Sequence, residues 1–271
     1  MTQRVALVTG ASSGIGKATT ELLARSNYYV FAIARRMDRL EQMRSDHIEP
    51  IYLDVTDAEA IRASVDHVIS TKGRIDVLVN NAAFGQLGAI ECVSMEAARH
   101  QFDVNVFGYA RFMQAVLPHM REQKSGSIVN IASALGRMAI PGFGWYAASK
   151  YAIEALSESL RGEVLKFGIK VVVIAPGLIK TEFVAKEFKL LSTVSHPPVY
   201  QKLLAGLHHL LAGEPKAPGP EIIANAVLHA VTTSTPPIRH ALPVDSKTAV
   251  IARWLLGDRI FAWAIRHKMK I

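Results

Sequence analysis

The sequence has little cysteine and no long apolar run, and each shortage excludes a class of protein. Cys92 is the only cysteine among 271 residues, which excludes an internal disulfide and a cysteine-based metal site. No apolar stretch reaches the ~18 to 20 residues that span a bilayer. The apolar run Val5–Val8, directly behind Arg4, is too short for the core of a secretory signal. We therefore expect a cytoplasmic protein, and we expect no metal site.

Acidic side chains are outnumbered by basic ones. The 23 Asp and Glu residues against 31 Lys and Arg give a formal net charge of +8 and a pI near 9.6. Such a balance favours anionic partners: a phosphorylated cofactor, a lipid surface or nucleic acid. The basic residues are scattered and form no run before the C-terminus, so nucleic acid is not expected as a partner. With 50% hydrophobic and 20% charged residues, the composition is typical of a compact domain with a sizeable core.

A tyrosine and a lysine lie four residues apart in Tyr146–Lys150, within a stretch whose apolar residues repeat at helical spacing. On a helix these two side chains share a face. A tyrosine of ordinary pKa needs a drop of ~3 units, or ~4 kcal/mol, to exchange a proton near neutrality. An ammonium group ~4 Å away supplies about that much at an effective dielectric near 20. The pair is therefore a candidate proton donor with its activator, although an ordinary surface helix also carries such pairs.

A glycine-rich turn, Thr9–Gly16, lies between a short buried strand expected over Val5–Val8 and a helical pattern that includes Leu22 and Leu23. The glycines permit a tight turn and close approach of the backbone, and the N-terminus of the helix faces the anion. The flanking strand and helix give this turn the context of a phosphate site for a dinucleotide.

A second buried strand, Val30–Ala34, ends at Arg35 and Arg36. In a dinucleotide-binding fold, the residue about 20 positions beyond the glycines meets the adenosine ribose, and an acidic residue there accepts from the free 2′-hydroxyl of NAD. Arg35 would instead pair with a 2′-phosphate, which predicts NADP(H). The alternative is a solvated loop arginine. Arg36 is the weaker candidate, because neighbouring residues at an extended end point opposite ways.

Strands and helices alternate through the first two thirds of the chain. Further strands are expected over 51–53, 75–79, 127–132 and 170–175, and helices over 37–44, 58–70, 95–121 and from residue 146 onward. This alternation predicts an α/β protein with a doubly wound Rossmann fold, whose parallel sheet is covered on both faces. Ligands then bind beyond the C-terminal ends of the strands, where Asp54 and Asn81 lie. Asn105 interrupts a helical run, which is compatible with a functional role or with an ordinary satisfied asparagine.

These residues together resemble the short-chain dehydrogenase/reductase family. The resemblance covers about residues 3–182, and its motifs occur in the family's order and spacing: Thr9–Gly16, Asn80–Ala82, Asn105, Ser133, Tyr146–Lys150, Pro176–Gly177 and Thr181. Two positions depart from the family pattern. Ala83 stands where the family usually has glycine, and Ser13 stands where many NADP-using members carry a basic residue.

The resemblance implies a seven-stranded sheet of order 3-2-1-4-5-6-7 and an NADP(H)-dependent oxidoreductase that interconverts a carbonyl and an alcohol. It implies that Tyr146 donates the proton in reduction and that Ser133 binds the substrate oxygen. Lys150 would lower the pKa of Tyr146 and hold the nicotinamide ribose, while Asn105 would hold a water that links Lys150 to solvent. Contacts with the cofactor are implied for Gly10, Ser12, Ser13, Gly14, Ile15, Gly16, Arg35, Arg36, Asp54, Val55, Asn81, Tyr146, Lys150, Pro176, Gly177, Ile179 and Thr181.

Beyond Thr181 the motifs end and the chain becomes apolar. We expect the stretch 182–220 to be a substrate lid, with a helix start at Pro197–Pro198 and a stop at Gly213. Its leucines predict a bulky lipophilic substrate that is steroid-, retinoid- or lipid-like, contacted also by Leu135, Phe143 and Trp145. The alternative is that these leucines only pack the lid onto the sheet.

The C-terminal stretch, about 245–271, follows a helix expected over 221–232 and a last strand over 238–242. We expect two helices in it, capped by Ser246 and Asp258. Its aromatic and basic residues, including Trp254, Phe261 and Trp263, suit an interfacial helix, which predicts peripheral membrane contact. Packing against the domain itself or a partner subunit is the alternative.

We expect one domain over 1–271. The resemblance implies a homodimer or homotetramer paired through the helices over 95–121 and 146–166. Two other functions remain open: reduction of acyl chains on a carrier protein, and sensing of NADP(H) without turnover. The intact set of Ser133, Tyr146 and Lys150 argues against the sensor.

Overall fold

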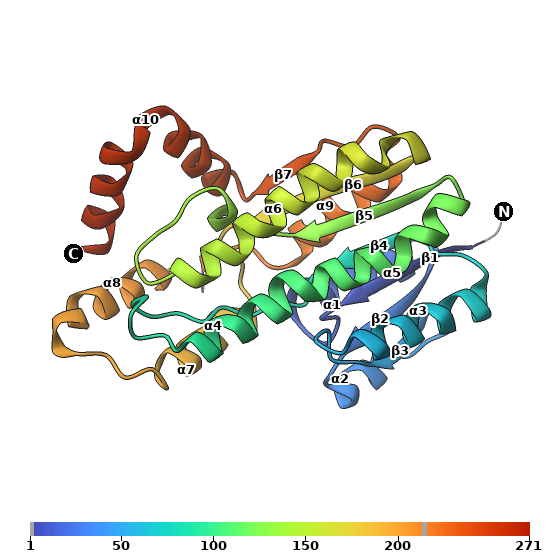
Figure 1. The fold of residues 1–271 in the computed structure, drawn as a ribbon, viewed down its shortest axis with the longest axis horizontal. Coiled ribbons are helices and arrows are strands. Elements are labelled where there is room, and N and C mark those ends of the chain that lie inside the picture. Colours follow the sequence, from blue (N-terminus) through green and yellow to red (C-terminus); the bar gives the residue numbers. More distant parts are fainter. Residues whose placement is uncertain (1–2, 213–215) are drawn as a thin grey trace.

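The computed structural model, which describes residues 3–212 and 216–271, contains one parallel sheet of seven strands. The strand order is β3-β2-β1-β4-β5-β6-β7, as expected (Figure 1). The strands are β1 (Arg4–Thr9), β2 (Tyr28–Ala34), β3 (Ile48–Tyr52), β4 (Val77–Asn80), β5 (Gly126–Ile131), β6 (Ile169–Pro176) and β7 (Arg239–Leu242). The third strand begins three residues earlier than the expected 51–53, because Ile48 pairs with Val30 of β2.

Helices cover both faces of this sheet, which confirms the doubly wound fold. One face carries α1 (Gly14–Arg25) and α9 (Glu221–Thr232), and the other carries α3 (Ala58–Lys72), α5 (Gly108–Glu122) and α6 (Gly144–Val164), while the short α2 (Met37–Glu41) follows β2. Side chains alternate along the buried strand β1 to fill both layers. Val5 and Leu7 belong to the α3–α5–α6 core, whereas Ala6 and Val8 belong to the α1–α9 core.

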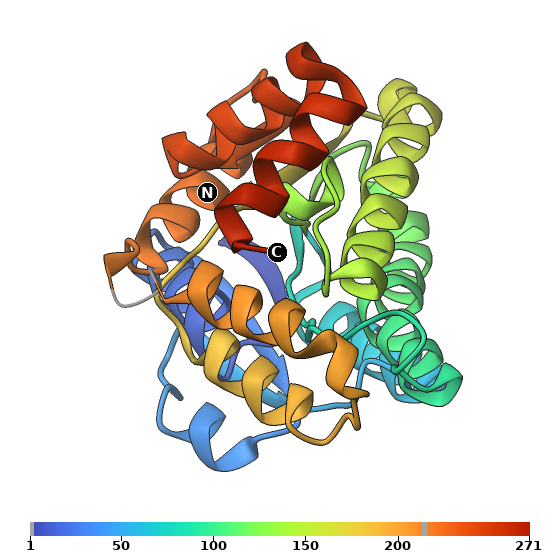
Figure 2. The same cartoon turned by 90° about the vertical axis from the view of Figure 1, so that its left-hand side faces the viewer.

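Three further helices lie beyond the C-terminal ends of the strands, on the side that faces the viewer in Figure 2. They are α7 (Glu182–Leu191), α8 (Gln201–Leu211), preceded by a 3₁₀ turn (Pro198–Tyr200), and α10 (Val244–Met269). Their inner faces share a third apolar cluster that includes Tyr146, Leu207 and Met269. The stretch expected as a lid therefore packs over the end of the sheet, and the expected helix stop at Gly213 lies outside the described residues.

The helical run over 95–121 is divided. It consists of α4 (Met95–Phe102), a π-helical turn (Asp103–Phe107) and α5. The C-terminal stretch forms α10, which bends at Gly257, where φ is 67° and ψ is 176°. Because α10 begins at Val244, the expected cap at Ser246 is wrong: Ser246 is inside the helix and buried. No helix of the described residues is long and apolar enough to cross a membrane.

Candidate active site

The glycine loop connects β1 to α1 in a conformation that side chains would disrupt. Gly14 has a φ of 54°, in the left-handed region that glycine adopts most easily. At Gly16, a Cβ atom would lie 2.3 Å from the carbonyl oxygen of Gly10 and 2.5 Å from the side-chain nitrogen of Asn81. The first turn of α1 therefore packs directly on the loop and on the end of β4.

Hydrogen bonds from Asn81 hold the ends of β1 and β4 together. The backbone N–H of Asn81 donates to Thr9 Oγ1 at 2.9 Å, and Asn81 Nδ2 donates to the carbonyl oxygen of Thr9 at 2.9 Å. The start of α1 is left open, because its N-cap residue Ser13 makes no side-chain hydrogen bond to the helix. The backbone N–H groups of a helix start are available to an anion in such an arrangement, so the loop fits the phosphates of a dinucleotide.

The two arginines after β2 point in different directions, as adjacent residues on an extended end do. Arg35 pairs with Asp54 at 3.2 Å, and its side chain is 64% exposed. Arg36 folds onto the glycine loop, where its guanidinium donates to Ser12 Oγ at 2.9 Å and to Ser13 Oγ at 2.7 Å. Both side chains line the same cavity, so Arg36 is placed as well for an anion as Arg35.

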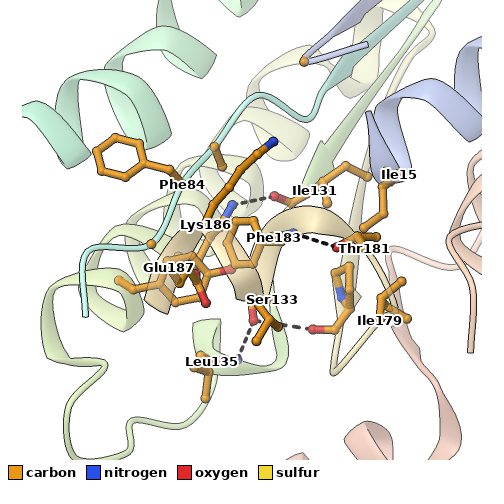
Figure 3. Close-up of a pocket in the computed structure, with 18 of the residues that line it drawn as sticks. Ile15, Phe84, Ile131, Ser133, Leu135, Ile179, Thr181, Phe183, Lys186 and Glu187 are labelled. Atoms are coloured by element: carbon orange, nitrogen blue, oxygen red, sulfur yellow. Dashed lines mark hydrogen bonds between the residues drawn. The ribbon is translucent and has the colours of Figure 1, made fainter. Parts of the chain in front are cut away.

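Ser133, Tyr146 and Lys150 come together at the other end of this cavity, whose volume is about 930 Å³. Ser133 follows β5, and its Oγ accepts from the backbone N–H of Leu135 at 3.1 Å (Figure 3). Lys150 Nζ donates to the carbonyl oxygen of Ile131 at 2.9 Å and lies 5.7 Å from the centre of the Tyr146 ring. These three predicted catalytic side chains are buried.

Burial, more than mutual charge, sets the protonation of the pair on α6. Burial raises the pKa of Tyr146, the charge of Glu187 raises it further, and a hydrogen bond with Ser133 opposes this. Burial lowers the pKa of Lys150 to about 7. The expected lowering of the pKa of Tyr146 by Lys150 is therefore not found here, because desolvation of the phenol outweighs the attraction of Lys150, whose own pKa is lowered by burial.

Asn105 lies in the π-helical turn between α4 and α5 and is fully buried. Its Oδ1 accepts from the backbone N–H of Phe84 at 3.0 Å, and its Nδ2 donates to the carbonyl oxygen of Phe84 at 2.8 Å and to Ser149 Oγ at 3.1 Å. A π-helical turn inside a helix is often found at a functional site. Here the π-helical turn holds the Asn105 amide between the loop after β4 and helix α6. The contact of Asn105 with a water stays a prediction.

The segment after β6 closes the cavity next to Ser133. The backbone N–H of Gly177 donates to the carbonyl oxygen of Leu242 at 2.7 Å, and a Cβ atom at Gly177 would lie 1.6 Å from Ser246 Oγ. Thr181 caps α7 by accepting from the N–H of Phe183 at 3.3 Å. The other predicted cofactor contacts that line the cavity are Gly10, Ile15, Val55, Pro176 and Ile179.

Comparison with known proteins agrees with the family resemblance of the sequence motifs. A family profile described as short chain dehydrogenase matches residues 4–190. A relative named 3-ketodihydrosphingosine reductase, from Bacteroides thetaiotaomicron, is 33% identical over 267 residues, which cover 98% of each chain. The chain belongs to the short-chain dehydrogenase family.

Solved structures agree with this membership of the short-chain dehydrogenase family. A short-chain dehydrogenase from Streptomyces avermitilis is 37% identical, with a TM-score of 0.85 and 94% of each chain covered. Another, from Burkholderia cenocepacia J2315 in complex with NADP, is 25% identical, with a TM-score of 0.75 over 100% of this chain and 98% of that chain. Structures of similar fold hold NAD as well as NADP. The protein is thus an oxidoreductase that uses a nicotinamide cofactor on alcohol or carbonyl groups.

Two features of this short-chain dehydrogenase differ from what the motifs indicate. Trp145 does not line the cavity, because it is turned toward Phe102, with ring centres 6.4 Å apart, whereas Leu135 and Phe143 do line it. Glu187 of α7 does line the cavity and no motif indicates it. The helical spacing of the sequence did indicate that Glu187 is buried. Glu187 lies three residues after Val184 and four before Leu191, on the buried stripe of α7.

Proposed function

We propose that this short-chain dehydrogenase interconverts a lipophilic ketone and its secondary alcohol with NADP(H). The observation that carries the proposal is the lining of the cavity of about 930 Å³, which joins Ser133 and Tyr146 to apolar side chains. Those side chains come from four regions of the chain, namely the segment before α6, then α7, α8 and α10: Leu135, Phe143, Phe183, Leu210, Leu211 and Ile265. One relative is named for the reduction of a keto compound, which supports the same reaction type.

The protein's part in this reaction is to hold and protonate the carbonyl. The cofactor, when bound, supplies or accepts the hydride. Ser133 and Tyr146 line the same end of the cavity, so both hydroxyls can meet one carbonyl oxygen. Tyr146 is protonated at neutral pH, which is the form that donates a proton in reduction, and a positive charge on Lys150 would stabilise the phenolate that remains.

A homologous series of ketones tests the substrate class. Because the lid presents apolar side chains, catalytic efficiency with NADPH should rise with chain length by up to ~0.8 kcal/mol for each buried CH₂ group. The measurement is kcat/KM from the absorbance of NADPH for ketones of increasing length. A flat response, or a strong preference for the same acyl group on a carrier protein, would contradict the proposal.

The preference for NADP(H) rests on Arg35 and Arg36 at the adenosine end of the cavity. Arg35→Asp removes a guanidinium and adds a charge that repels a 2′-phosphate, so NADPH binding should weaken by roughly 1.5 to 3 kcal/mol. Binding of NADH should weaken much less. Titration calorimetry of both cofactors measures this, with the exposed Arg62→Asp of α3 as the control. Equal affinity of the unchanged protein for NADH and NADPH would rule out the preference.

We also propose that a cytoplasmic form of this protein touches membranes reversibly through the bend of α10. Trp254 and Trp263 are 82% and 66% exposed on either side of Gly257, and Leu255 and Ile260 are also exposed. The neighbouring basic side chains Arg259 and Arg266 complement an anionic lipid surface. Phe261, expected on this face, instead packs inward and is 7% exposed.

Sedimentation with vesicles that contain anionic lipid tests this contact. The pair Trp254→Ser and Trp263→Ser should lower the bound fraction, because two exposed aromatic side chains supply most of the inserted area. Removal of all of α10 is a poor test, since it also removes the buried Phe261 and Met269. Lack of sedimentation of the unchanged protein would exclude the membrane role.

A homodimer or homotetramer is proposed from the outer face of α4, α5 and α6. Met95, Phe107 and Leu156 are 51%, 52% and 39% exposed there, and a shallow groove between Met95, Phe107 and Trp145 adds apolar surface. Such a patch is typical of a covered interface. A monomer mass by light scattering would contradict this assembly.

A further inference from the structure

Glu182, the first residue of α7, attaches the lid to the adenosine end of the cavity. Its Oε2 accepts from Arg36 Nη1 at 3.2 Å, and its Oε1 accepts from Arg39 Nη1 at 2.7 Å. On the same helix as Glu182, Lys186 Nζ lies 2.9 Å from Oε2. One carboxylate of the lid therefore pairs with two arginines that follow β2 and with one lysine of α7.

This carboxylate is charged at neutral pH and yet open to replacement. Hydrogen bonds from Lys186 and Arg39 lower the pKa of Glu182 to about 2. The Glu182 side chain is 46% exposed, and the ion pairs of exposed side chains are individually weak. An anion that binds the same arginines more strongly can therefore displace the carboxylate.

The guanidinium group of Arg36 is held against the glycine loop by two serines. Its Nε donates to Ser12 Oγ at 3.1 Å, and its Nη2 donates to Ser12 Oγ at 2.9 Å and to Ser13 Oγ at 2.7 Å. The serines hold Arg36 without help from Glu182, so the acid is not needed to orient the guanidinium. Because Nη1 faces Glu182, an anion that binds Arg36 through Nη1 has to replace the carboxylate.

The start of α7 is also in contact with the cofactor loop and with the reacting end of the cavity. A Cβ atom at Gly14 would lie 3.2 Å from Cγ2 of Thr181, the residue that caps α7 (Figure 3). The ring centre of Phe183, one residue after Glu182, lies 5.8 Å from that of Tyr146. A shift of this helix start therefore reaches the side chain next to the proposed proton donor.

The two nicotinamide cofactors differ at one group that can compete with Glu182. NADP carries a phosphate where NAD has a free 2′-hydroxyl. A phosphate monoester has a charge of about −1.5 to −2 at pH 7 and three acceptor oxygens. It can bind a guanidinium through two hydrogen bonds, whereas Glu182 accepts one from Arg36.

We propose that Glu182 competes with the 2′-phosphate of NADP(H) for Arg36, so that NADP(H) weakens the attachment of the lid and NAD(H) leaves it in place. This inference rests on the proposed preference for NADP(H). Lys186 lies on the same helix as Glu182, so the carboxylate keeps a partner when Arg36 turns to the phosphate. Glu182 is thus a residue that sets cofactor specificity and couples the cofactor to the position of the lid.

Two adenosine fragments, 2′,5′-ADP and 5′-AMP, differ only in the 2′-phosphate and test the competition without turnover. Glu182→Gln should strengthen binding of 2′,5′-ADP by roughly two- to fivefold, the range for one exposed ion pair. It should leave the affinity for 5′-AMP unchanged. Titration calorimetry measures both. Weaker binding of 2′,5′-ADP by Glu182→Gln would show that the acid orients Arg36 and would overturn the competition.

Asp38→Asn is the matched control for charge. Asp38 is an exposed acid in the first turn of α2, beside Arg39 in the sequence, and it forms no ion pair within the part of the chain that the structure describes. The substitution removes the same charge as Glu182→Gln and should leave the affinity for 2′,5′-ADP unchanged. An equal gain in both variants would assign the effect to net charge and would overturn the role of Glu182.

Hydrogen exchange of the α7 amides measures the attachment of the lid. In the unchanged protein, these amides should exchange faster with 2′,5′-ADP bound than with 5′-AMP bound, because the contact between Glu182 and Arg36 is lost. In Glu182→Gln the two fragments should give the same exchange. Equal exchange with both fragments in the unchanged protein would overturn the coupling to the lid.

The outcomes separate this inference from the proposed function. If the unchanged protein binds 2′,5′-ADP no more tightly than 5′-AMP, the proposed preference for NADP(H) fails. If it prefers 2′,5′-ADP and Glu182→Gln keeps the same ratio of affinities, the preference stands and the competition is wrong. Circular dichroism shows whether each variant is folded.

Discussion

Replacement of Tyr146 by phenylalanine should lower kcat for ketone reduction by ~10² to 10⁴, the range for general acid catalysis. The hydroxyl of Tyr146 is the proposed proton donor at this end of the cavity, and it carries its proton at neutral pH. The ring itself remains, so its contacts with Phe143 and Phe183, whose centres lie 6.3 and 5.8 Å away, are kept. The fall in kcat therefore measures the contribution of proton donation by the hydroxyl group.

The control for this variant is the affinity for the cofactor. The glycine loop and Lys150 are unchanged in Tyr146→Phe, so NADPH titration should give a dissociation constant close to that of the unchanged protein. Tyr151→Phe, one turn further along α6 and 41% exposed, should leave kcat unchanged. A Tyr146→Phe protein that turns over at near the original rate would show that another group donates the proton.

Local patterns were enough to predict the fold and to name residues that the structure brings together in one cavity. The turn Thr9–Gly16 is recognisable because its glycines, its preceding strand and its following helix are contiguous in the chain. The order of the strands follows from the family resemblance, and Ser133, Tyr146 and Lys150 converge because the carboxyl ends of parallel strands meet at one edge of the sheet.

The properties that could not be predicted depend on contacts between distant segments. Burial of Glu187 requires the pairing of α7 with Gly85, which lies about one hundred residues earlier in the chain. The pKa of Tyr146 was expected to fall from the charge of Lys150 alone, whereas burial in the folded protein adds desolvation that the pair itself does not contain. Trp145 adjoins Tyr146, yet helix geometry turns it toward Phe102.

The position of Arg36 illustrates the same limit at closer range. Strand alternation predicted that Arg35 and Arg36 would point opposite ways, and they do. Strand alternation could not show that the glycine loop lies against Arg36, where Ser12 and Ser13 accept hydrogen bonds from the Arg36 guanidinium. Ser13 stands where many NADP-using relatives have a basic residue, so Arg36 brings a positive charge to that place from another strand.

Lys150→Met should lower the efficiency of ketone reduction by roughly a hundredfold. Donation of the proton leaves a phenolate on Tyr146, and an ammonium group stabilises that negative charge. At the observed 5.7 Å between Lys150 Nζ and the ring centre, the attraction is about 3 kcal/mol at an effective dielectric near 20, and each 1.4 kcal/mol is a factor of ten. Methionine has nearly the same length and no charge, so packing against Tyr109 is largely kept.

The pH dependence distinguishes this electrostatic role from a structural one. Burial lowers the pKa of Lys150 to about 7, so its charge is present below that pH and is lost as the pH rises through it. The kcat/KM of the unchanged protein should therefore decline above about pH 7, and Lys150→Met should show a low rate without this step. Lys166→Met, exposed beyond the end of α6, should keep both the rate and the step. A step that persists in Lys150→Met would assign the titration to another group and leave Lys150 with binding of the cofactor alone.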